Sequence, residues 1–233
     1  MLSTGMTTRR RSLPRLRNVD SADLANLQRL PDTALELKAI AVALNADPAT
    51  SLHLGREANE KVVKSSDLSK YRVVAFATHG LMPGDLNGLT QPALALSSPS
   101  VANVDGDGLL TMEEILPLKL DADWVVLSAC NTGAGATADA EAASGLGRAF
   151  FYAGSRALLL TNWPVESLSA RNLVSEVFRR QAADPRLSRA EALQQAMLAV
   201  MDGPGYSENS VELYSYAHPT FWGPYTLIGD GAN

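Results

Sequence analysis

The chain has 233 residues, of which 46% are hydrophobic, and a formal net charge of −5. This length and composition suit one globular domain with a substantial core. A single cysteine excludes an intrachain disulfide and every multi-cysteine zinc site, and we expect no metal and no cofactor. The cysteine count fits a reducing, cytoplasmic location, and the absence of an apolar run of about 18 residues predicts no membrane-spanning helix.

Charge is distributed unevenly along the chain. Residues 1–19 contain five arginines and no acid, and the chain from residue 20 onward contains the remaining 15 basic residues and all 25 acids. This acidic body argues against nucleic acid as the main partner. It suits a cationic partner or substrate, and equally a surface that aids solubility. Residues 1–29 lack the apolar run of a secretory signal and are interpreted as a basic flexible arm or a linker from an upstream domain, and residues 30–233 as the folded domain.

The predicted elements alternate between helix and strand. The first predicted helix covers 32–45, where Leu35, Ala39, Val42 and Ala43 stand at helical spacing, and a short strand and then a helix follow within 51–71. Next come a buried strand over 71–79, a short strand over 92–97, a hairpin or loop over 103–111, a short helix over 111–118 and a second buried strand over 123–129. The chain continues with a helix over 141–154, a third buried strand over 156–165, helices over 168–183 and 188–202, and a last strand over 219–229. This alternation predicts a mostly parallel sheet with helices on both faces.

Two of the predicted buried strands lead into reactive side chains. His79 follows VVAFAT, and Cys130 follows WVVLSA 51 residues later. In a parallel sheet the carboxyl ends of neighbouring strands lie together, so these side chains can converge. An imidazole beside a thiol favours the nucleophilic thiolate. A lone cysteine is also common as a small buried hydrophobe, so the residue pattern alone leaves a catalytic dyad and a structural pair as equal alternatives.

Several longer blocks of the sequence resemble one protein family. The blocks FATHG, LLTMEEI, WVVLSACNTG, SGLGRAFFYAG, NWPV and HPTFWGPYTLIG stand in the order and spacing of the CHAT family, over roughly residues 30–230. CHAT domains are caspase-like and are often carried after tetratricopeptide repeats. The resemblance implies a caspase/separase-type three-layer α/β/α sandwich with a mostly parallel central sheet. It also implies a cysteine endopeptidase with a Cys–His dyad.

The resemblance assigns roles at matching positions. His79 corresponds to the general acid/base and Cys130 to the nucleophile. The backbone N–H groups of Gly80 and Cys130 are the expected oxyanion donors, and a neighbouring carbonyl suffices to orient the imidazole. His218 is a competing base, but it precedes the last strand and matches a structural position of the family. His53 has no assigned role.

Loops after the nucleophile and after the next strand form the substrate pocket in this fold class. They hold Asp139, Glu141, Trp163 and Glu166. An acid on the pocket floor would favour Arg or Lys before the scissile bond. The alternative is that these acids are solvated loop charges, or charges at the N-terminus of the helix after residue 141, and that Trp163 belongs to the core.

Residues 103–114, NVDGDGLLTMEE, resemble an EF-hand calcium loop at most positions. The segment before them carries prolines and serines and is no entering helix, and Pro117 stops the exit helix early. Asp-Gly pairs favour turns and explain most of the pattern. We therefore expect a hairpin turn in preference to a calcium site.

The resemblance thus implies a bacterial-type cysteine endopeptidase that cleaves a protein substrate, with a tetratricopeptide-repeat or other regulatory protein as a further partner. The alternative is a non-catalytic interaction module on the same fold. Neither nucleic acid nor a membrane is an expected partner.

Overall fold

The computed structural model describes residues 24, 26–128 and 138–232. Its strands are β1 (Val73–Phe76), β2 (Gly80–Leu81), β3 (Ala93–Ala95), β4 (Leu109–Thr111), β5 (Trp124–Leu127), β6 (Ala157–Thr161), β7 (Tyr206–Glu208), β8 (Val211–Tyr214) and β9 (Tyr225–Gly229). Its α-helices are α2 (Thr33–Ala43), α3 (Pro48–Ser51), α4 (Glu60–Ser65), α5 (Pro99–Ala102), α6 (Met112–Ile115), α7 (Ala138–Ala153), α8 (Ser167–Ala183) and α9 (Arg189–Met201). Short 3₁₀ turns cover η1 (Gly55–Glu57), η2 (Leu68–Lys70) and η3 (Pro219–Phe221).

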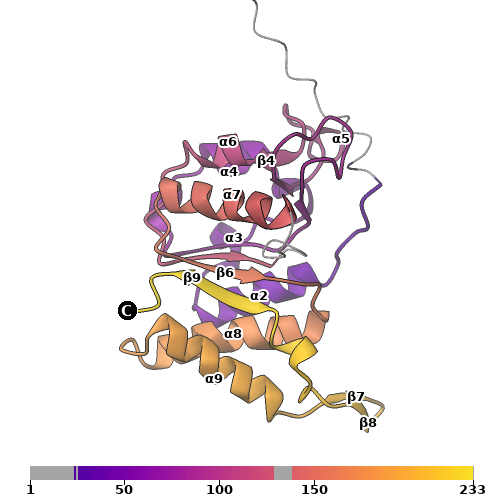
Figure 1. The fold of residues 1–233 in the computed structure, drawn as a ribbon, viewed down its shortest axis with the longest axis vertical. Helices are drawn as coiled ribbons and strands as arrows, with labels where there is room; N and C mark the ends of the chain where they lie inside the picture. Colours follow the sequence, from indigo (N-terminus) through magenta and orange to yellow (C-terminus); the bar gives the residue numbers. More distant parts are fainter. Residues whose placement is uncertain (1–23, 25, 129–137, 233) are drawn as a thin grey trace, which may run out of the picture.

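Four strands form the central sheet, in the order β1-β5-β6-β9 (Figure 1). β1, β5 and β6 are parallel, and β9 returns antiparallel beside β6. Every residue of β5 and β6 is buried, as continuous apolar runs predict for strands covered on both faces. The predicted α/β fold with a mostly parallel sheet is therefore confirmed.

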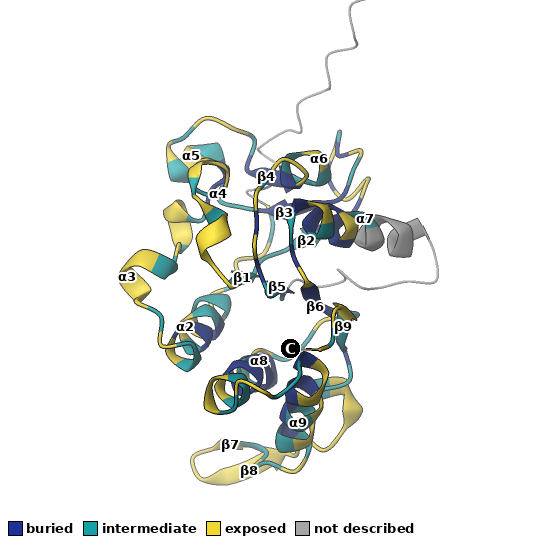
Figure 2. Ribbon diagram, turned by 90° about the vertical axis from the view of Figure 1, so that its left-hand side faces the viewer, coloured by how far each residue is buried: buried dark blue, intermediate teal, exposed yellow. Residues whose placement is uncertain are grey.

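Helices cover both faces of this sheet, which gives three layers (Figures 1 and 2). Successive residues of β5 point to opposite faces: Trp124 and Val126 join the core under α2, α8 and α9, whereas Val125 and Leu127 join the core under α7. One strand thus holds the two cores together.

A second sheet, β2-β3-β4, is antiparallel. Leu94 and Leu110 of this sheet are fully buried in the core under α7. A third cluster on the other side of the small sheet includes Leu24 and Leu81, with Leu27 packed against it. The domain boundary at residue 30 stays a prediction, and the chain packs on this sheet before that position.

Ion pairs connect elements at the amino end of the parallel strands. Arg72, Arg156 and Arg189 each reach the carboxylate of Asp123, which directly precedes β5. The Arg189 side chain is only 4% exposed and also pairs with Asp230. The start of β5, the start of α9 and the last residues of the described chain are therefore tied together.

The structure corrects two sequence-based expectations and contains one hairpin that they did not include. The helix predicted over 32–45 is present as α2, but its buried residues are Glu36, Ile40 and Ala41, whereas Val42 is 76% exposed. The short strand expected within 51–71 is absent. Residues 52–54, near the start of this range, have no regular secondary structure. The hairpin of β7 and β8 was not predicted. A two-residue turn, in which Asn209 and its neighbour have positive φ, joins these strands.

We expect Phe150→Ala to lower the free energy of unfolding by about 3–5 kcal/mol. The Phe150 ring is fully buried and lies 5.6 Å, centroid to centroid, from Phe76, so truncation leaves a cavity beneath β1 and β5. Urea denaturation measures the loss. Tyr152→Ala, in the same helix at a side chain 82% exposed, is the control and should cost less than about 0.5 kcal/mol. Equal losses for the two variants would contradict this core assignment.

Candidate active site at the carboxyl edge of the sheet

The candidate histidine and cysteine follow paired strands at the same distance. Phe76, the last residue of β1, is in register with Leu127, the last residue of β5. His79 stands three residues after Phe76, and Cys130 stands three residues after Leu127 in the sequence. Cys130 itself lies outside the described residues. The described part of the chain thus brings the two strand ends that precede these residues to one edge of the sheet, where parallel α/β folds place their sites.

The backbone around His79 is fixed by β3. The Ala95 amide donates to the His79 carbonyl at 2.9 Å, and the Thr78 hydroxyl donates to the Ala95 carbonyl. Gly80 then begins β2 and pairs with Leu94. His79 is therefore held between the two sheets, and Gly80, the expected oxyanion donor, lies directly beside it.

A backbone carbonyl orients the His79 ring. Nε2 of His79 lies 2.7 Å from the carbonyl oxygen of Gln28, in the segment before α2. Because a carbonyl oxygen only accepts, Nε2 is the donor, and Nδ1 is the acceptor of the neutral ring. Nδ1 is therefore the nitrogen able to receive a proton.

The other two histidines lie in different surroundings. Nδ1 of His218 accepts the amide of Thr220 at 3.2 Å and caps η3, which fits the structural position expected for it. His53 is exposed between α3 and α4.

The expected pocket residues fall into two groups. Trp163 is 40% exposed just after β6, and its indole N–H donates to the Thr220 carbonyl at 3.4 Å. Glu166 caps α8, and its carboxylate accepts the amides of Leu168 and Ser169. This N-cap role at α8 was not predicted, because the sequence suggested helix N-terminal charges only for the helix after residue 141. Positions 139 and 141 lie in the first turn of α7, and the side chains of Asp139 and Glu141 lie outside the described part.

Sequence reasoning missed a buried acid at this edge. Glu36 on α2 is 5% exposed and accepts a hydrogen bond from the Ser128 side chain, directly after β5. Burial raises the pKa of Glu36 from 4.5 to about 7, and the Ser128 hydrogen bond partly offsets this rise. The Tyr225 hydroxyl is buried nearby, and burial followed by the charge of Glu36 raises the pKa of Tyr225. Oε1 of Glu36 has no partner among the described residues.

Within residues 103–114, a turn over 103–108 precedes β4 and α6, and Glu60 of α4 organises this turn. Oε2 of Glu60 accepts the amides of Asp107 and Gly108 at 2.8 and 2.7 Å. Lys64 binds the carboxylates of Glu60 and Glu114, each at 2.6 Å. The cation beside these acids is therefore a lysine ammonium. The residues of the described ranges contain no cluster of three or more His, Cys, Asp or Glu suited to a metal.

No helix in the described part of the chain is both long and apolar enough to cross a membrane.

Comparison with known proteins identifies relatives of this chain. The family model described as CHAT domain matches residues 7–230. Tetratricopeptide repeat protein 28 of Mus musculus is 32% identical over 122 residues, which is 52% of this chain and 4% of the mouse protein. The chain thus corresponds to a small part of that relative's length.

We expect Glu36→Gln to change how stability depends on pH. The folded-state pKa is about 7, above the ordinary 4.5, so the folded chain holds this proton more tightly than the unfolded chain. The protonated Glu36 carboxyl therefore contributes fully to the free energy of unfolding below pH 4.5. This contribution, about 3 kcal/mol, is lost as pH rises through 7. Urea denaturation from pH 4.5 to 8 should therefore show a smaller decline for Glu36→Gln than for the wild type.

The exposed Glu208→Gln provides the control for this series and should keep the wild-type decline. Parallel curves for Glu36→Gln and the wild type would refute the assignment of a raised pKa to Glu36.

A second substitution tests the turn at 103–108. Glu60→Ala leaves two amides without their acceptor and should lower the free energy of unfolding by about 2–4 kcal/mol. Chemical denaturation measures this loss, and Glu113→Ala, at an exposed position, should lose less than about 0.5 kcal/mol. A Glu60→Ala variant as stable as Glu113→Ala would disprove the organising role of Glu60.

Proposed function

Because the chain belongs to the CHAT domain family, we propose that it is a cysteine endopeptidase that uses His79 and Cys130 as its catalytic dyad. The family has a caspase-like, peptidase-related fold. One observation carries the proposal: the two residues follow the registered ends of β1 and β5 by the same three positions. The orientation of the His79 ring by the Gln28 carbonyl supports it further.

In the proposed reaction, Nδ1 of His79 removes the proton from the Cys130 thiol. The thiolate attacks the carbonyl carbon of the scissile peptide bond and forms a tetrahedral intermediate. When this intermediate collapses, His79 returns the proton to the leaving amine, and a thioester remains on Cys130. Water, deprotonated by His79, hydrolyses the thioester and releases the acid product.

Negative charge develops on the former carbonyl oxygen during this attack. Backbone N–H groups beside the dyad stabilise such a charge without reorganisation. We assign this role to Gly80, which is fixed beside His79 by β3, and to Cys130.

The proposed substrate is a protein, with a basic residue before the scissile bond. Asp139, Glu141, Trp163 and Glu166 are the proposed pocket residues. The Glu166 carboxylate already accepts two helix amides, which favours Asp139 and Glu141 as the acids that select a basic side chain.

The proposed setting is a reducing, cytoplasmic compartment in a bacterium, where Cys130 stays reduced. A regulatory partner, such as a tetratricopeptide-repeat protein, is part of the proposal, because the mouse relative is named for such repeats. The same relative favours a second candidate function, a non-catalytic interaction module. The reactivity of the thiol separates the two.

We expect Cys130 to react with iodoacetamide faster below pH 8.5 than an ordinary thiol does, because a neighbouring imidazolium stabilises the thiolate. The chain has no other cysteine, so mass spectrometry of the intact protein reports one site. His79→Ala should slow alkylation at pH 6.5 at least tenfold and move the midpoint toward 8.5. His53→Ala, which changes an exposed histidine outside the proposed dyad, should leave the rate unchanged.

A slow wild-type reaction that His79→Ala leaves unaltered would argue for the interaction module. A fast reaction that depends on His79 would justify a search for cleaved proteins by N-terminal peptide profiling.

A further inference from the structure

β1 has the composition of an interior strand but lies at the edge of the sheet. β5 is the only strand paired with β1 in the described part of the chain. Val73, Val74 and Ala75 are only half-buried, whereas every residue of β5 and β6 is buried. Edge strands usually carry lysine, proline or a bulge that prevents further pairing. Residues 73–77, VVAFA, carry no charge and no proline, so the strand itself has none of these features.

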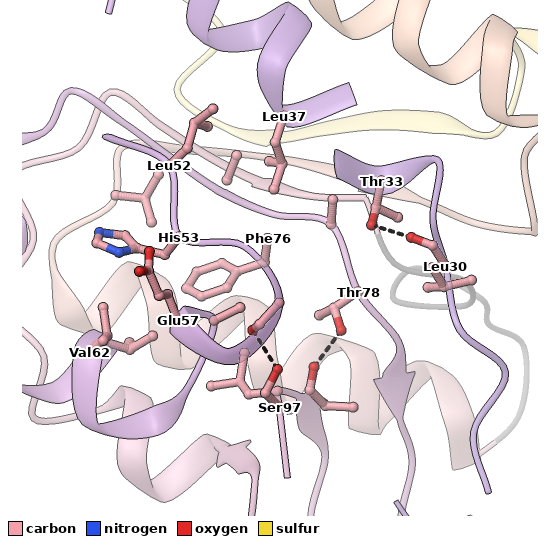
Figure 3. A pocket seen from close by; sticks show the side chains of 18 of the residues that line it. Leu30, Thr33, Leu37, Leu52, His53, Glu57, Val62, Phe76, Thr78 and Ser97 are labelled. Carbon is pink, nitrogen blue, oxygen red and sulfur yellow. Dashed lines mark hydrogen bonds between the residues drawn. The ribbon is translucent and has the colours of Figure 1, made fainter. Parts of the chain in front are cut away.

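A cavity of about 1030 Å³ runs along this edge (Figure 3). Every residue from Lys70 to His79 lines it. Leu37 of α2 lies on one side, Val62 of α4 on another, and Leu52 belongs to the connection between α3 and α4. We call this cavity the β1 groove. The groove lies beyond β1, on the side of this strand that faces away from β5.

The backbone of β1 offers hydrogen-bonding groups to the groove. The Arg72 carbonyl accepts the amide of Trp124, and the Phe76 carbonyl accepts the amide of Ser128, on the side of β5. Because N–H and C=O groups alternate sides along a strand, those of the odd-numbered residues 73–77 point away from β5. These N–H and C=O groups therefore face the side of β1 on which the groove lies. The backbone of an added extended strand would match the spacing between them.

The size of the groove suits a short strand. A strand residue takes up roughly 160 Å³, from a rise of about 3.3 Å, a strand spacing of about 4.8 Å and a layer thickness of about 10 Å. The groove volume of about 1030 Å³ then corresponds to about six residues. Its walls are apolar toward both α2 and α4, so side chains on both faces of that strand would be apolar.

Charge at the groove favours acidic residues at the ends of such a segment. The lining cations are Arg29, Lys70 and Arg72, and Glu57 is the only acid in the lining of this groove. Lys70 and Arg72 are largely exposed, although Lys70 also pairs with Asp67 and Arg72 with Asp123. A partner with Asp or Glu on either side of its apolar residues would complement this excess.

We propose that the β1 groove is a docking site for an extended segment of a partner polypeptide. The segment pairs with β1 as an additional strand and consists of about six β-branched, mainly apolar residues flanked by acids. Strand addition of this kind obtains affinity from backbone hydrogen bonds and specificity from alternate side chains. His79 is among the residues that line the groove, so the added strand would brace the strand that positions this residue. The proposal concerns binding and holds whether or not the chain is a peptidase.

A fluorescein-labelled peptide, Glu-Val-Ile-Val-Thr-Val-Ile-Glu, tests this site by anisotropy with the wild-type chain. We expect saturable binding, and at least tenfold weaker binding when lysines replace the two glutamates. In NMR hydrogen exchange, the amides of residues 73, 75 and 77 should exchange at least tenfold more slowly with the peptide bound. The absence of saturable binding, or binding without slower exchange at these amides, would overturn the proposal.

A matched pair of variants locates the site on α2. Leu37→Glu places a charge in the groove wall and should weaken peptide binding at least tenfold. Leu35→Glu, in the same helix at a side chain 47% exposed and outside the lining, should bind like the wild type. Equal affinities of the two variants would contradict the site. If Leu37→Glu fails to fold, as circular dichroism would show, the exchange experiment on the wild type decides alone.

Discussion

The structure depends on the burial of β5 on both faces of the sheet. Its alternate side chains belong to two different cores, and its backbone pairs with β1 on one side and β6 on the other. Slippage by one residue would exchange the two sets of side chains between cores of different shape. The register of β1 against β5 is therefore fixed by packing, and with it the positions at which the two chain segments leave the sheet.

The two ends of these strands differ in character. At the amino end, Asp123 gathers three arginines, one of them almost fully buried. Removing a buried charge from such a network leaves its partner uncompensated, so this end resists change. The carboxyl end holds polar groups that are only partly satisfied, including Oε1 of Glu36 and the Tyr225 hydroxyl. The amino end thus holds a network of ion pairs, in which Nε of Arg189 is also without a partner among the described residues, and the carboxyl end holds the candidate catalytic residue His79.

The sequence predicted the central strands because burial on both faces demands continuous apolar residues, and the helices α7, α8 and α9 because of their length and periodicity. It also predicted that His79 would follow a strand. The sequence-based prediction failed where contacts between distant parts of the chain decide which residues are buried. In α2, exposed Leu35 and Val42 suggested the wrong face, since Glu36 is buried by contact with Ser128 from a distant strand. The apolar composition of β1 concealed its position at the edge, because composition does not reveal how many neighbours a strand has.

The contact between His79 and Gln28 has a consequence for genetics. The acceptor is a main-chain oxygen, so it is present whatever side chain occupies position 28. A scan that replaces each residue by alanine would pass over this position without effect on the bond. A substitution at position 28 therefore leaves this acceptor oxygen in place. Selection would act instead on the path of the backbone before α2, through the residues that fix the conformation of this segment.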